Sequence, residues 1–318
     1  MNIIITGTAG FIGFNLAQYI LKKYKHINIY GIDNINNYYS TKLKIDRLNI
    51  LKKNKQFFFI KNDINSISKI KKLKNKKIEC IINLAAQAGV RYSIENPKKY
   101  LDSNIHGFFE ILEYCKKNNV KKLIYASSSS VYGDQKKFPL TEQLNNKPLN
   151  FYGFSKKNNE EMAEIYSHLY KINSIGLRFF TVYGEWGRPD MFMIKYLNYL
   201  FYKKPKFYLY NYGKHYRDFT YIGDVVKIID KIMQQKTFKD HKVFNICSNK
   251  PTKLTTIIKK INLISKRSSK VYKTKLQKAD IIKTHGNNNK IKQFTKFKKF
   301  TKLDLGLNNL INWFKSYK

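Results

Sequence analysis

The first half of the chain alternates short apolar runs with longer stretches in which polar and apolar residues share helical spacing. The apolar runs predict buried strands at residues 2–6, 27–32, 57–61, 78–84, 122–127 and 174–179. The longer stretches predict helices at residues 10–23, 97–118 and 152–171. Buried strands separated by helices are typical of a parallel, doubly wound sheet, so we expect an α/β fold.

The pattern changes after Phe180. Glycine, proline and aromatic residues cluster at residues 184–216, and residues 243–246 look like one more strand of the main sheet. From about residue 254 onward, the sequence predicts short helices and loops without a clear linker. We therefore expect a first domain at residues 1–180, with a returning segment near 217–248, and a smaller C-terminal lobe at residues 181–318.

The composition is strongly basic, with a formal net charge of +40 over 318 residues. Only six of the 61 basic residues are arginines, and the lysines are spread along the chain. Proteins that read nucleic acids usually rely on the planar fork of arginine, so the charge indicates a compositional bias and no nucleic-acid partner. Where arginine is this rare, each arginine is a candidate for a specific contact.

Other classes of protein are disfavoured by simple features. No apolar run approaches the length that spans a membrane, and an opening strand leaves no room for a leader peptide. The three cysteines, Cys80, Cys115 and Cys247, are widely spaced, which fits reduced thiols better than disulfides or a metal site. We expect a cytoplasmic protein with no metal and no membrane partner.

A glycine-rich turn follows the first predicted strand and opens the first predicted helix. It reads G-T-A-G-F-I-G at residues 7–13. Glycines let the backbone approach a pyrophosphate closely, and the start of a helix offers free N–H groups to it. Asp33 ends the second strand, where its carboxylate can accept hydrogen bonds from a ribose and would repel a 2′-phosphate. Together these features predict a Rossmann-type site for NAD rather than NADP.

A tyrosine and a lysine stand four residues apart at the start of a later helix. Tyr152 and Lys156 therefore share one helical face, and a lysine charge beside a tyrosine favours the phenolate. Such a pair can take a proton from an alcohol. In a chain with 24 tyrosines and many lysines the spacing alone is weak, so its position matters more than its existence.

These motifs together resemble the extended short-chain dehydrogenase/reductases, the NAD-dependent epimerase/dehydratase family. The resemblance rests on G-x-x-G-x-x-G at residues 7–13, the serines at residues 127–130 followed by V-Y-G, and Y-x-x-x-K at residues 152–156. Longer blocks are similar to UDP-glucuronate 4-epimerases: A-A-Q-A-G-V-R-Y-S at residues 85–93, L-R-F-F-T-V-Y-G at 177–184, W-G-R-P-D-M at 186–191, and Y-N-Y-G at 210–213 leading to R-D-F-T-Y at 217–221.

The resemblance implies a set of cofactor-binding residues. They are Gly7, Gly10, Phe11, Ile12, Gly13, Asp33, Asp63, Ile64, Ala85, Ala86, Gln87, Asn104, Tyr152 and Lys156. Asp63, after the third strand, is a candidate for the adenine amino group, and the alternative is that it caps a helix.

The resemblance also implies a mechanism. Tyr152 would take the proton of the sugar 4-hydroxyl while C4 passes a hydride to NAD, and the ketone formed would then be reduced from its other face. Lys156 would hold the nicotinamide ribose. Ser128 occupies the position of the family's catalytic Ser or Thr, and Ser127 and Ser129 remain alternatives because consecutive serines blur the register.

The same resemblance implies a set of substrate contacts in an acidic UDP-sugar. They are Arg91, Ser127, Ser128, Ser129, Thr181, Arg188, Arg217 and Asp280. Arg188 can pair with a carboxylate, and the alternative is a structural salt bridge between the lobes. Arg217 resembles an arginine that contacts the UDP phosphates, whereas Asp280 follows Ala279 where the family has glycine.

Other functions remain open at this point. A neutral UDP-sugar 4-epimerase, acting on UDP-glucose or UDP-N-acetylglucosamine, is the main alternative. A dehydratase or decarboxylase of the same family is expected to carry an acid in the serine cluster, where this chain has Ser129 and Ser130. An inactive binding protein is disfavoured by the intact Tyr152 and Lys156. Members of the family commonly form homodimers through helices that correspond to residues 97–118 and 152–171, so we expect a homodimer.

Overall fold

The computed structural model describes residues 1–203, 205–235, 238–277 and 280–317. Lys278 and Ala279, which include the predicted departure from the family's glycine, lie outside these residues. The described chain divides into two compact units, and each unit is built from three separate stretches of the sequence. The first contains residues 1–134, 142–179 and 226–244, and the second contains residues 135–141, 180–225 and 245–318.

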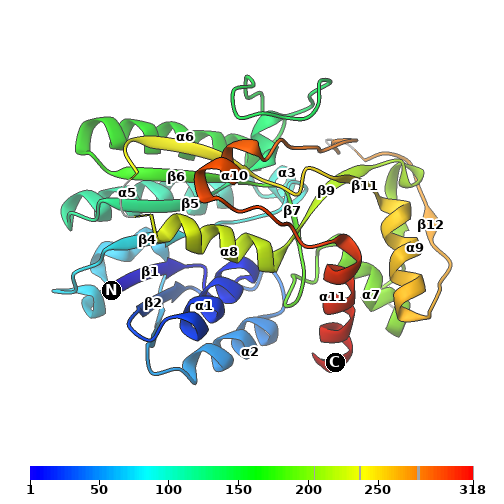
Figure 1. Ribbon diagram of the computed structural model, residues 1–318, viewed down its shortest axis with the longest axis horizontal. Helices are drawn as coiled ribbons and strands as arrows, with labels where there is room; N and C mark the ends of the chain where they lie inside the picture. Colours follow the sequence, from blue (N-terminus) through cyan, green and yellow to red (C-terminus); the bar gives the residue numbers. More distant parts are fainter. Residues whose placement is uncertain (204, 236–237, 278–279, 318) are drawn as a thin grey trace. The chain divides into compact units, whose positions relative to one another are not determined.

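A seven-stranded sheet forms the centre of the first unit (Figure 1). Its strands in chain order are β1 (Asn2–Thr6), β2 (Asn28–Asp33), β3 (Phe57–Lys61), β4 (Cys80–Asn83), β5 (Lys122–Ser128), β6 (Asn173–Phe179) and β10 (His241–Ile246). They lie in the order β10-β6-β5-β4-β1-β2-β3, and the five pairings from β3 to β6 are parallel. The predicted Rossmann-type α/β fold is therefore confirmed.

The strand order reverses between β1 and β4. From β1 the chain proceeds through β2 to β3, and from β4 it proceeds through β5 to β6 on the other side. Crossovers that run in opposite directions with the same right-handed sense place their helices on opposite faces of the sheet. The carboxyl ends of β1 and β4 meet at this reversal, which is where doubly wound sheets bind their ligands.

Helices pack against the sheet because this contact buries their apolar faces. They are α1 (Phe11–Lys23), α2 (Thr41–Lys52), α5 (Gly107–Lys117) and α6 (Phe151–Tyr170). Ile111, Leu112 and Ala163 from α5 and α6 join Ile4 and Leu123 of the sheet in one buried cluster. Burial of such side chains stabilises the fold by about 1.5–3 kcal/mol each.

The second unit has a core of its own. It contains the three-stranded sheet β11-β9-β7 and the helices α7 (Phe192–Tyr202), α9 (Leu254–Ser265), α10 (Asn289–Thr295) and α11 (Leu303–Tyr317). The strands are β7 (Thr181–Tyr183), β9 (Tyr216–Tyr221) and β11 (Pro251–Lys253), and a further pair joins β8 (Tyr208–Leu209) to β12 (Tyr272–Lys273). Tyr196 and Leu197 of α7, Ile261 of α9 and Leu310 of α11 are fully buried together.

Several sequence predictions need correction. Helix α2 was not predicted, and the single helix expected at residues 97–118 is three consecutive segments: α4 (Pro97–Tyr100), the π-helical η3 (Leu101–His106) and α5. The C-terminal helices α9 and α11 have 12 and 15 residues, so they are longer than expected. The returning segment of the first unit is 226–244 rather than 217–248, and residues 135–141 belong to the second unit.

Candidate active site

The turn after β1 is shaped by glycines that no other residue could replace. Gly7 has a φ of +70°, and a Cβ there would lie 2.8 Å from the backbone nitrogen of Ala85, just beyond β4. A Cβ on Gly13 would lie 2.1 Å from the carbonyl oxygen of Gly7. The backbone of the turn thus carries no side chain at Gly7 and Gly13 and leads straight into α1. These features fit the pyrophosphate of a dinucleotide, which binds to backbone N–H groups at such a helix start.

The middle of this turn is held from both sides. The Ala9 N–H donates to Asp33 Oδ2 at 3.0 Å, and the Ala9 carbonyl accepts from Arg47 Nη1 at 2.7 Å. Arg47 comes from α2, is fully buried and also donates to the Tyr39 hydroxyl at 2.7 Å. Sequence reasoning missed Arg47, although the rarity of arginine was the signal that could have found it.

Asp33 has two backbone donors, because the Ile35 N–H donates to its Oδ1 at 2.8 Å. Burial raises the pKa of Asp33, and the backbone donors together with the charges of Lys44 and Arg47 oppose that shift. Each carboxylate oxygen retains a second lone pair that can accept from a ribose hydroxyl. The structure therefore gives Asp33 a role in holding the turn besides the predicted role in binding ribose.

Asp63 caps the short helix η1 (Ile64–Lys69), because its Oδ1 accepts from the Asn65 N–H at 3.0 Å. Its Oδ2 accepts from Asn34 Nδ2 at 2.7 Å. The capping alternative is thus the arrangement found, while an adenine contact by Asp63 or Ile64 stays a prediction.

The loop after β4 is fastened to α6 through Asn104. The Gln87 N–H donates to Asn104 Oδ1 at 2.7 Å, and Asn104 Nδ2 donates to the Gln87 carbonyl and to Ser155 Oγ, both at 3.0 Å. Asn104 lies in the π-helical segment η3, whose wider turn is often found at functional sites. This bracket sets the path of Ala85, Ala86 and Gln87. Arg91, further along the loop, has an exposed side chain.

The serine cluster begins at the end of β5, and its first two serines have different environments. Ser127 is buried and its hydroxyl donates to Glu160 Oε1 at 2.5 Å. Ser128 Oγ accepts from the Ser130 N–H at 3.1 Å, and Ser128 caps the short helix η4 (Ser129–Tyr132). Its hydroxyl hydrogen can still be donated, whereas that of Ser127 is engaged. The arrangement favours Ser128 over Ser127 as the serine that faces a substrate.

Tyr152 and Lys156 lie in the first two turns of α6. Asn150 starts this helix, since its Oδ1 accepts from the Gly153 N–H at 2.8 Å. Lys156 is only 2% exposed and its Nζ donates to the Ala126 carbonyl at 2.8 Å. Burial lowers the pKa of Lys156 to about 8, although the nearby Glu160 carboxylate acts in the opposite direction. The half-buried Tyr152 ring meets Tyr100 edge-on, with 6.1 Å between ring centroids.

The predicted substrate residues of the second unit lie at the beginning of β7, in β9 and in two loops. Thr181 starts β7. Arg188 forms a bidentate pair with Asp190, with Nε to Oδ1 at 2.9 Å and Nη2 to Oδ2 at 2.7 Å. Burial raises the pKa of Asp190, but Arg188 outweighs it and the net pKa is lowered. The salt bridge between Arg188 and Asp190 is therefore local, within one loop.

Two more predicted substrate residues lie near one another in the same unit. Arg217 Nη1 donates to the carbonyls of Tyr216 and Ile282 at 3.0 and 3.1 Å. Asp280 lies 3.8 Å from the Nε2 atom of the buried His215. The isolated bridge between Tyr216 and Lys283 places the segment after Asp280 beside the strand that carries Arg217.

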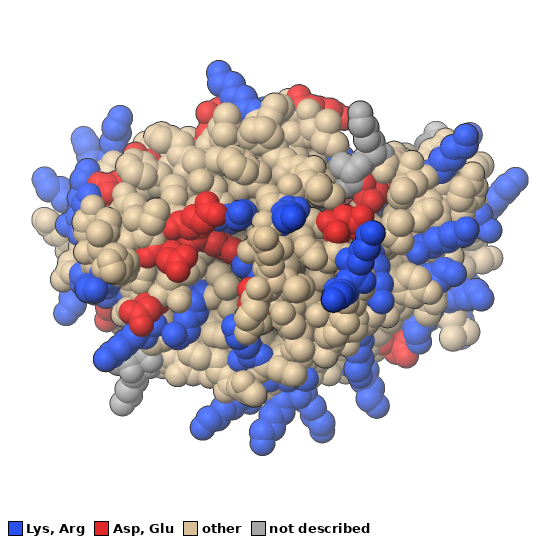
Figure 2. Space-filling model, turned by 90° about the horizontal axis from the view of Figure 1, so that it is seen from above, with Lys and Arg blue, Asp and Glu red and all other residues tan. Residues whose placement is uncertain are grey.

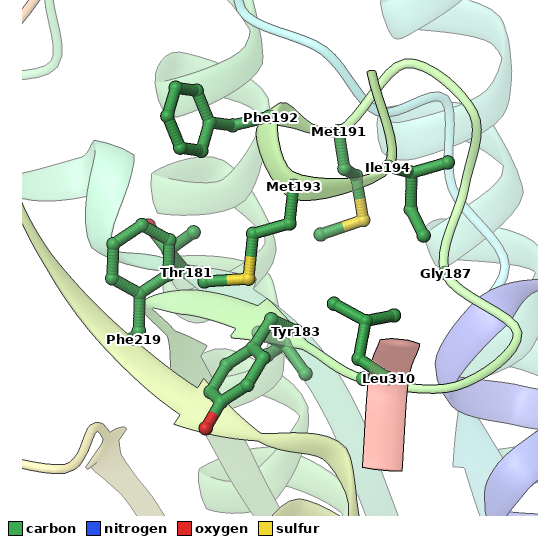
Figure 3. Close-up of a pocket in the computed structure, with 11 residues that line it drawn as sticks. Thr181, Tyr183, Gly187, Met191, Phe192, Met193, Ile194, Phe219 and Leu310 are labelled. Carbon is green, nitrogen blue, oxygen red and sulfur yellow. The ribbon is translucent and has the colours of Figure 1, made fainter. Parts of the chain in front are cut away.

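A small apolar cavity lies in the second unit, and Thr181 and Tyr183 of β7 are among the residues that line it (Figure 3). Its volume is about 20 Å³, and Met191, Met193, Ile194 and Leu310 point toward it. A cavity of this size holds a single water molecule, so it has no room for a sugar or a nucleotide. We regard it as a gap in the packing.

The surface charge is dispersed on the face drawn in Figure 2. Lysine and arginine side chains project from all around this face, and acidic side chains gather in smaller groups between them. In the described part of the chain, no helix is both long and apolar enough to cross a membrane, and no group of acidic, histidine and cysteine side chains could hold a metal ion.

The model of the NAD dependent epimerase/dehydratase family matches residues 3–247. The chain belongs to this family. A curated relative, the UDP-glucuronate 4-epimerase of Thermodesulfobacterium geofontis, is 37% identical over 316 residues, covering 98% of this chain and 95% of that protein. An uncharacterised protein of Methanocaldococcus jannaschii is 42% identical over 315 residues, covering 98% and 96%.

Among solved structures, the UDP-glucuronic acid 4-epimerase of Bacillus cereus, in complex with UDP-glucuronic acid and NAD, superimposes with a TM-score of 0.94. The two chains are 30% identical and each is covered completely. The predictions of the family, of NAD as cofactor and of an isomerase, an NAD-dependent nucleotide-sugar 4-epimerase, are confirmed at this level.

Proposed function

We propose that this protein interconverts UDP-glucuronate and UDP-galacturonate. The observation that carries the proposal is the Tyr152–Lys156 pair at the start of α6, in a chain similar throughout to the B. cereus epimerase. The blocks at residues 85–93 and 186–191, which resemble uronate epimerases, support the acidic sugar over a neutral one.

The proposed mechanism gives each residue one task. When bound, NAD supplies a group that accepts a hydride from C4 of the sugar and returns it. Tyr152 takes the proton from the 4-hydroxyl and gives it back at the end, and the Lys156 ammonium favours the phenolate form that this requires. Ser128 donates its hydroxyl hydrogen to the same sugar oxygen and keeps it in line with Tyr152.

NAD would be held by the backbone of the glycine turn and by the carboxylate of Asp33. A Cβ at Gly7, Gly10 or Gly13 would meet neighbouring backbone within 3 Å, so the turn keeps a backbone without side chains at these positions. Phe11 and Ile12 follow at the start of α1, where their N–H groups face outward from the helix end. We propose that Ala85, Ala86, Gln87 and Asn104 line the nicotinamide side, because Asn104 fixes the path of their loop.

An acidic sugar poses a chemical problem that the site must solve. Oxidation at C4 of a glucuronate produces a β-keto acid, which readily loses carbon dioxide. We propose that Thr181 and the serine cluster, apart from the engaged Ser127, fix the carboxylate, and that Arg188 is its charged partner. The Arg188 side chain is 24% exposed while it pairs with Asp190.

A neutral UDP-sugar is the second candidate, and one observation favours it. The fork of Arg188 is already engaged by Asp190 at 2.7–2.9 Å, so a substrate carboxylate would have to share or displace that partner. A dehydratase or a decarboxylase remains disfavoured, because Ser129 and Ser130 stand where an acid is expected.

The decisive experiment is to incubate purified protein with UDP-glucuronate, without added cofactor, and to resolve the product by NMR. We expect UDP-galacturonate. Formation of product only from UDP-glucose or UDP-N-acetylglucosamine would show that the sugar assignment is wrong. Tyr152→Phe is the matched control: it should retain bound NAD and lose turnover, and turnover in this variant would remove Tyr152 from the base role.

We also propose a homodimer in the cytoplasm. Helices α5 and α6 expose Phe109, Ile165 and Leu169, with 40%, 54% and 60% of each residue accessible. Exposed apolar side chains of this size on neighbouring helices are typical of an interface between copies. The three buried, free cysteines fit a reducing compartment.

A further inference from the structure

A buried ion pair lies directly behind the proposed catalytic residues. Glu160 of α6 and Arg178 of β6 form a bidentate contact, with Nε to Oε1 at 2.8 Å and Nη2 to Oε2 at 2.7 Å. Their side chains are only 9% and 3% exposed. Placing two charges in the interior is costly, and apolar residues would often give equal or better stability. A stability argument alone therefore does not explain why this pair is present.

The pair holds both ends of the turn that presents Ser128. At one end, the Ser127 hydroxyl donates to Glu160 Oε1 at 2.5 Å. At the other end, Arg178 Nη1 donates to the Tyr132 hydroxyl at 3.0 Å, and the guanidinium lies 4.9 Å from the Tyr132 ring centroid. Ser128 lies between these two anchors. Its hydroxyl therefore takes its direction from a turn that Glu160 and Arg178 fix at residues 127 and 132.

The pair also faces Lys156. Glu160 is one helical turn beyond Lys156 on α6, so both side chains lie on the face that covers the end of β5. Lys156 donates to the carbonyl of Ala126, and the next residue, Ser127, donates to Glu160. Two successive residues of β5 thus contact two successive turns of α6. The Glu160 carboxylate supports the charged form of Lys156 against the effect of burial.

Among the described residues, other titratable groups near the pair lie on β5, on α6 and on β10, which carries His241 and Lys242. Tyr125 of β5 and His241 of β10 are within electrostatic range of both Glu160 and Arg178, and Glu164 of α6 is within range of Tyr125. Burial lowers the pKa of His241 to about 4, so its ring is neutral near neutral pH, and burial also raises the pKa of Tyr125. Within this cluster, Glu160 is the carboxylate that opposes the effect of burial on Lys156.

We propose that the Glu160–Arg178 ion pair is a positioning element of the active site, which sets the direction of Ser128 and keeps Lys156 ready to assist Tyr152 without itself touching the substrate. The proposal assigns Ser127 to this element and leaves Ser128 as the serine that contacts the sugar. It rests on Tyr152 as the base, which is part of the proposed function, and is independent of which UDP-sugar is turned over.

Two single variants and a control test the proposal first, with kcat, KM and pH dependence measured beside thermal unfolding. Ser127→Ala keeps both charges but frees one end of the turn, and we expect kcat to fall by about ten- to a hundredfold with little change in KM. Glu160→Gln keeps the size of the side chain but removes its charge, and we expect the basic limb of the kcat profile to move to lower pH. Glu161→Gln is the matched control: Glu161 lies 3.5 Å from Lys157 on the exposed side of α6, and its loss should change neither kcat nor the profile.

Glu160→Gln leaves Arg178 buried without its carboxylate and can therefore fail to fold. The double variant Glu160→Met with Arg178→Met removes both charges together, which buried ion pairs often tolerate. A folded double variant with reduced kcat supports the proposal, and one with native kcat and a native pH profile overturns it. If neither charge variant folds, Ser127→Ala decides, since native kcat there would overturn the assignment of Ser127.

The assay uses whichever UDP-sugar the native protein turns over. An incorrect sugar assignment then appears in the native protein, whereas an incorrect role for the ion pair appears only in the variants. Lower thermal stability with unchanged kcat, KM and pH profile would show that the pair is purely structural and would overturn the proposal.

Discussion

Replacing Lys156 by methionine should make the cofactor-free protein more stable near neutral pH while it abolishes turnover. Lys156 is 2% exposed, and burial lowers its pKa from 10.5 to about 8. At about 1.4 kcal/mol for each pH unit, this difference corresponds to a penalty of about 3 kcal/mol for keeping the charge in the folded state. Methionine has a similar length and no charge. Loss of the hydrogen bond to the Ala126 carbonyl offsets about 1 kcal/mol, so the expected net gain is about 2 kcal/mol.

The pH dependence of that gain follows from the direction of the shift. Below about pH 8 the lysine is charged in both the folded and the unfolded protein, so the penalty is fully present. Between about 8 and 10.5 only the unfolded chain holds the proton, so the native protein gains stability relative to Lys156→Met as the pH rises. Above 10.5 neither state is charged and the penalty is absent.

The assay is urea unfolding of the native protein and of Lys156→Met, both freed of cofactor, across this range of pH. The control is Lys157→Met, which removes a partly exposed lysine from the next position of α6 and should show no such trend. A Lys156→Met protein that is less stable than the native one at about pH 7, with a difference that stays constant up to about pH 10, would refute the reasoning.

Three further predictions concern other parts of the molecule. Arg188→Ala should lower kcat/KM for UDP-glucuronate far more than for a neutral UDP-sugar, and equal losses for both would indicate that the Arg188–Asp190 contact is only structural. Arg47→Met should release the Ala9 carbonyl and reduce the NAD that copurifies with the protein, as measured after acid extraction; Arg267→Met is the control outside the cofactor turn, and equal NAD content in both would contradict the prediction. Leu169→Glu should shift the protein from dimer to monomer in light scattering, because it places a charge on an exposed apolar position of α6; a native protein that is already monomeric would contradict the proposed homodimer.

The parts of the fold that the sequence predicted are those with a regular pattern and local causes. The strands of the main sheet are runs of β-branched and aromatic residues, and the glycine turn stands directly after the first of them. Helix α2 was missed because its buried face includes Lys44 and Arg47, so the usual separation of apolar and charged residues is absent. These charges are buried because they contact Asn36 and Ala9, which are tertiary contacts that no spacing reveals.

The limits of prediction at the site have similar causes. Sequence alone left three serines open, since four consecutive serines have no internal register. In the structure, the hydrogen bond from Ser127 to Glu160, which is 33 residues away in sequence, distinguishes Ser127 from the other serines. The π-helical turn around Asn104 could not be predicted from the sequence either, because it depends on the hydrogen bonds that Asn104 forms with Gln87 and Ser155. Residues 135–141 join the second unit through the bridge from Leu140 to Gly286, across a sequence gap that no local pattern marks.

The hydrogen bonds that Asp33 and Arg47 form with Ala9 have a consequence for how the cofactor is bound during the reaction. Asp33 and Arg47 order the glycine turn, the cradle for the dinucleotide, without a ligand. The conformational entropy of the turn is therefore lost when the protein folds and is not lost again when the dinucleotide binds. By the proposed mechanism, a cofactor held in so rigid a cradle would dissociate slowly, and each turnover would restore it to its starting oxidation state. The reaction would then be insensitive to the balance of oxidised and reduced nicotinamide in its surroundings, and its direction would depend only on the relative amounts of the two sugars.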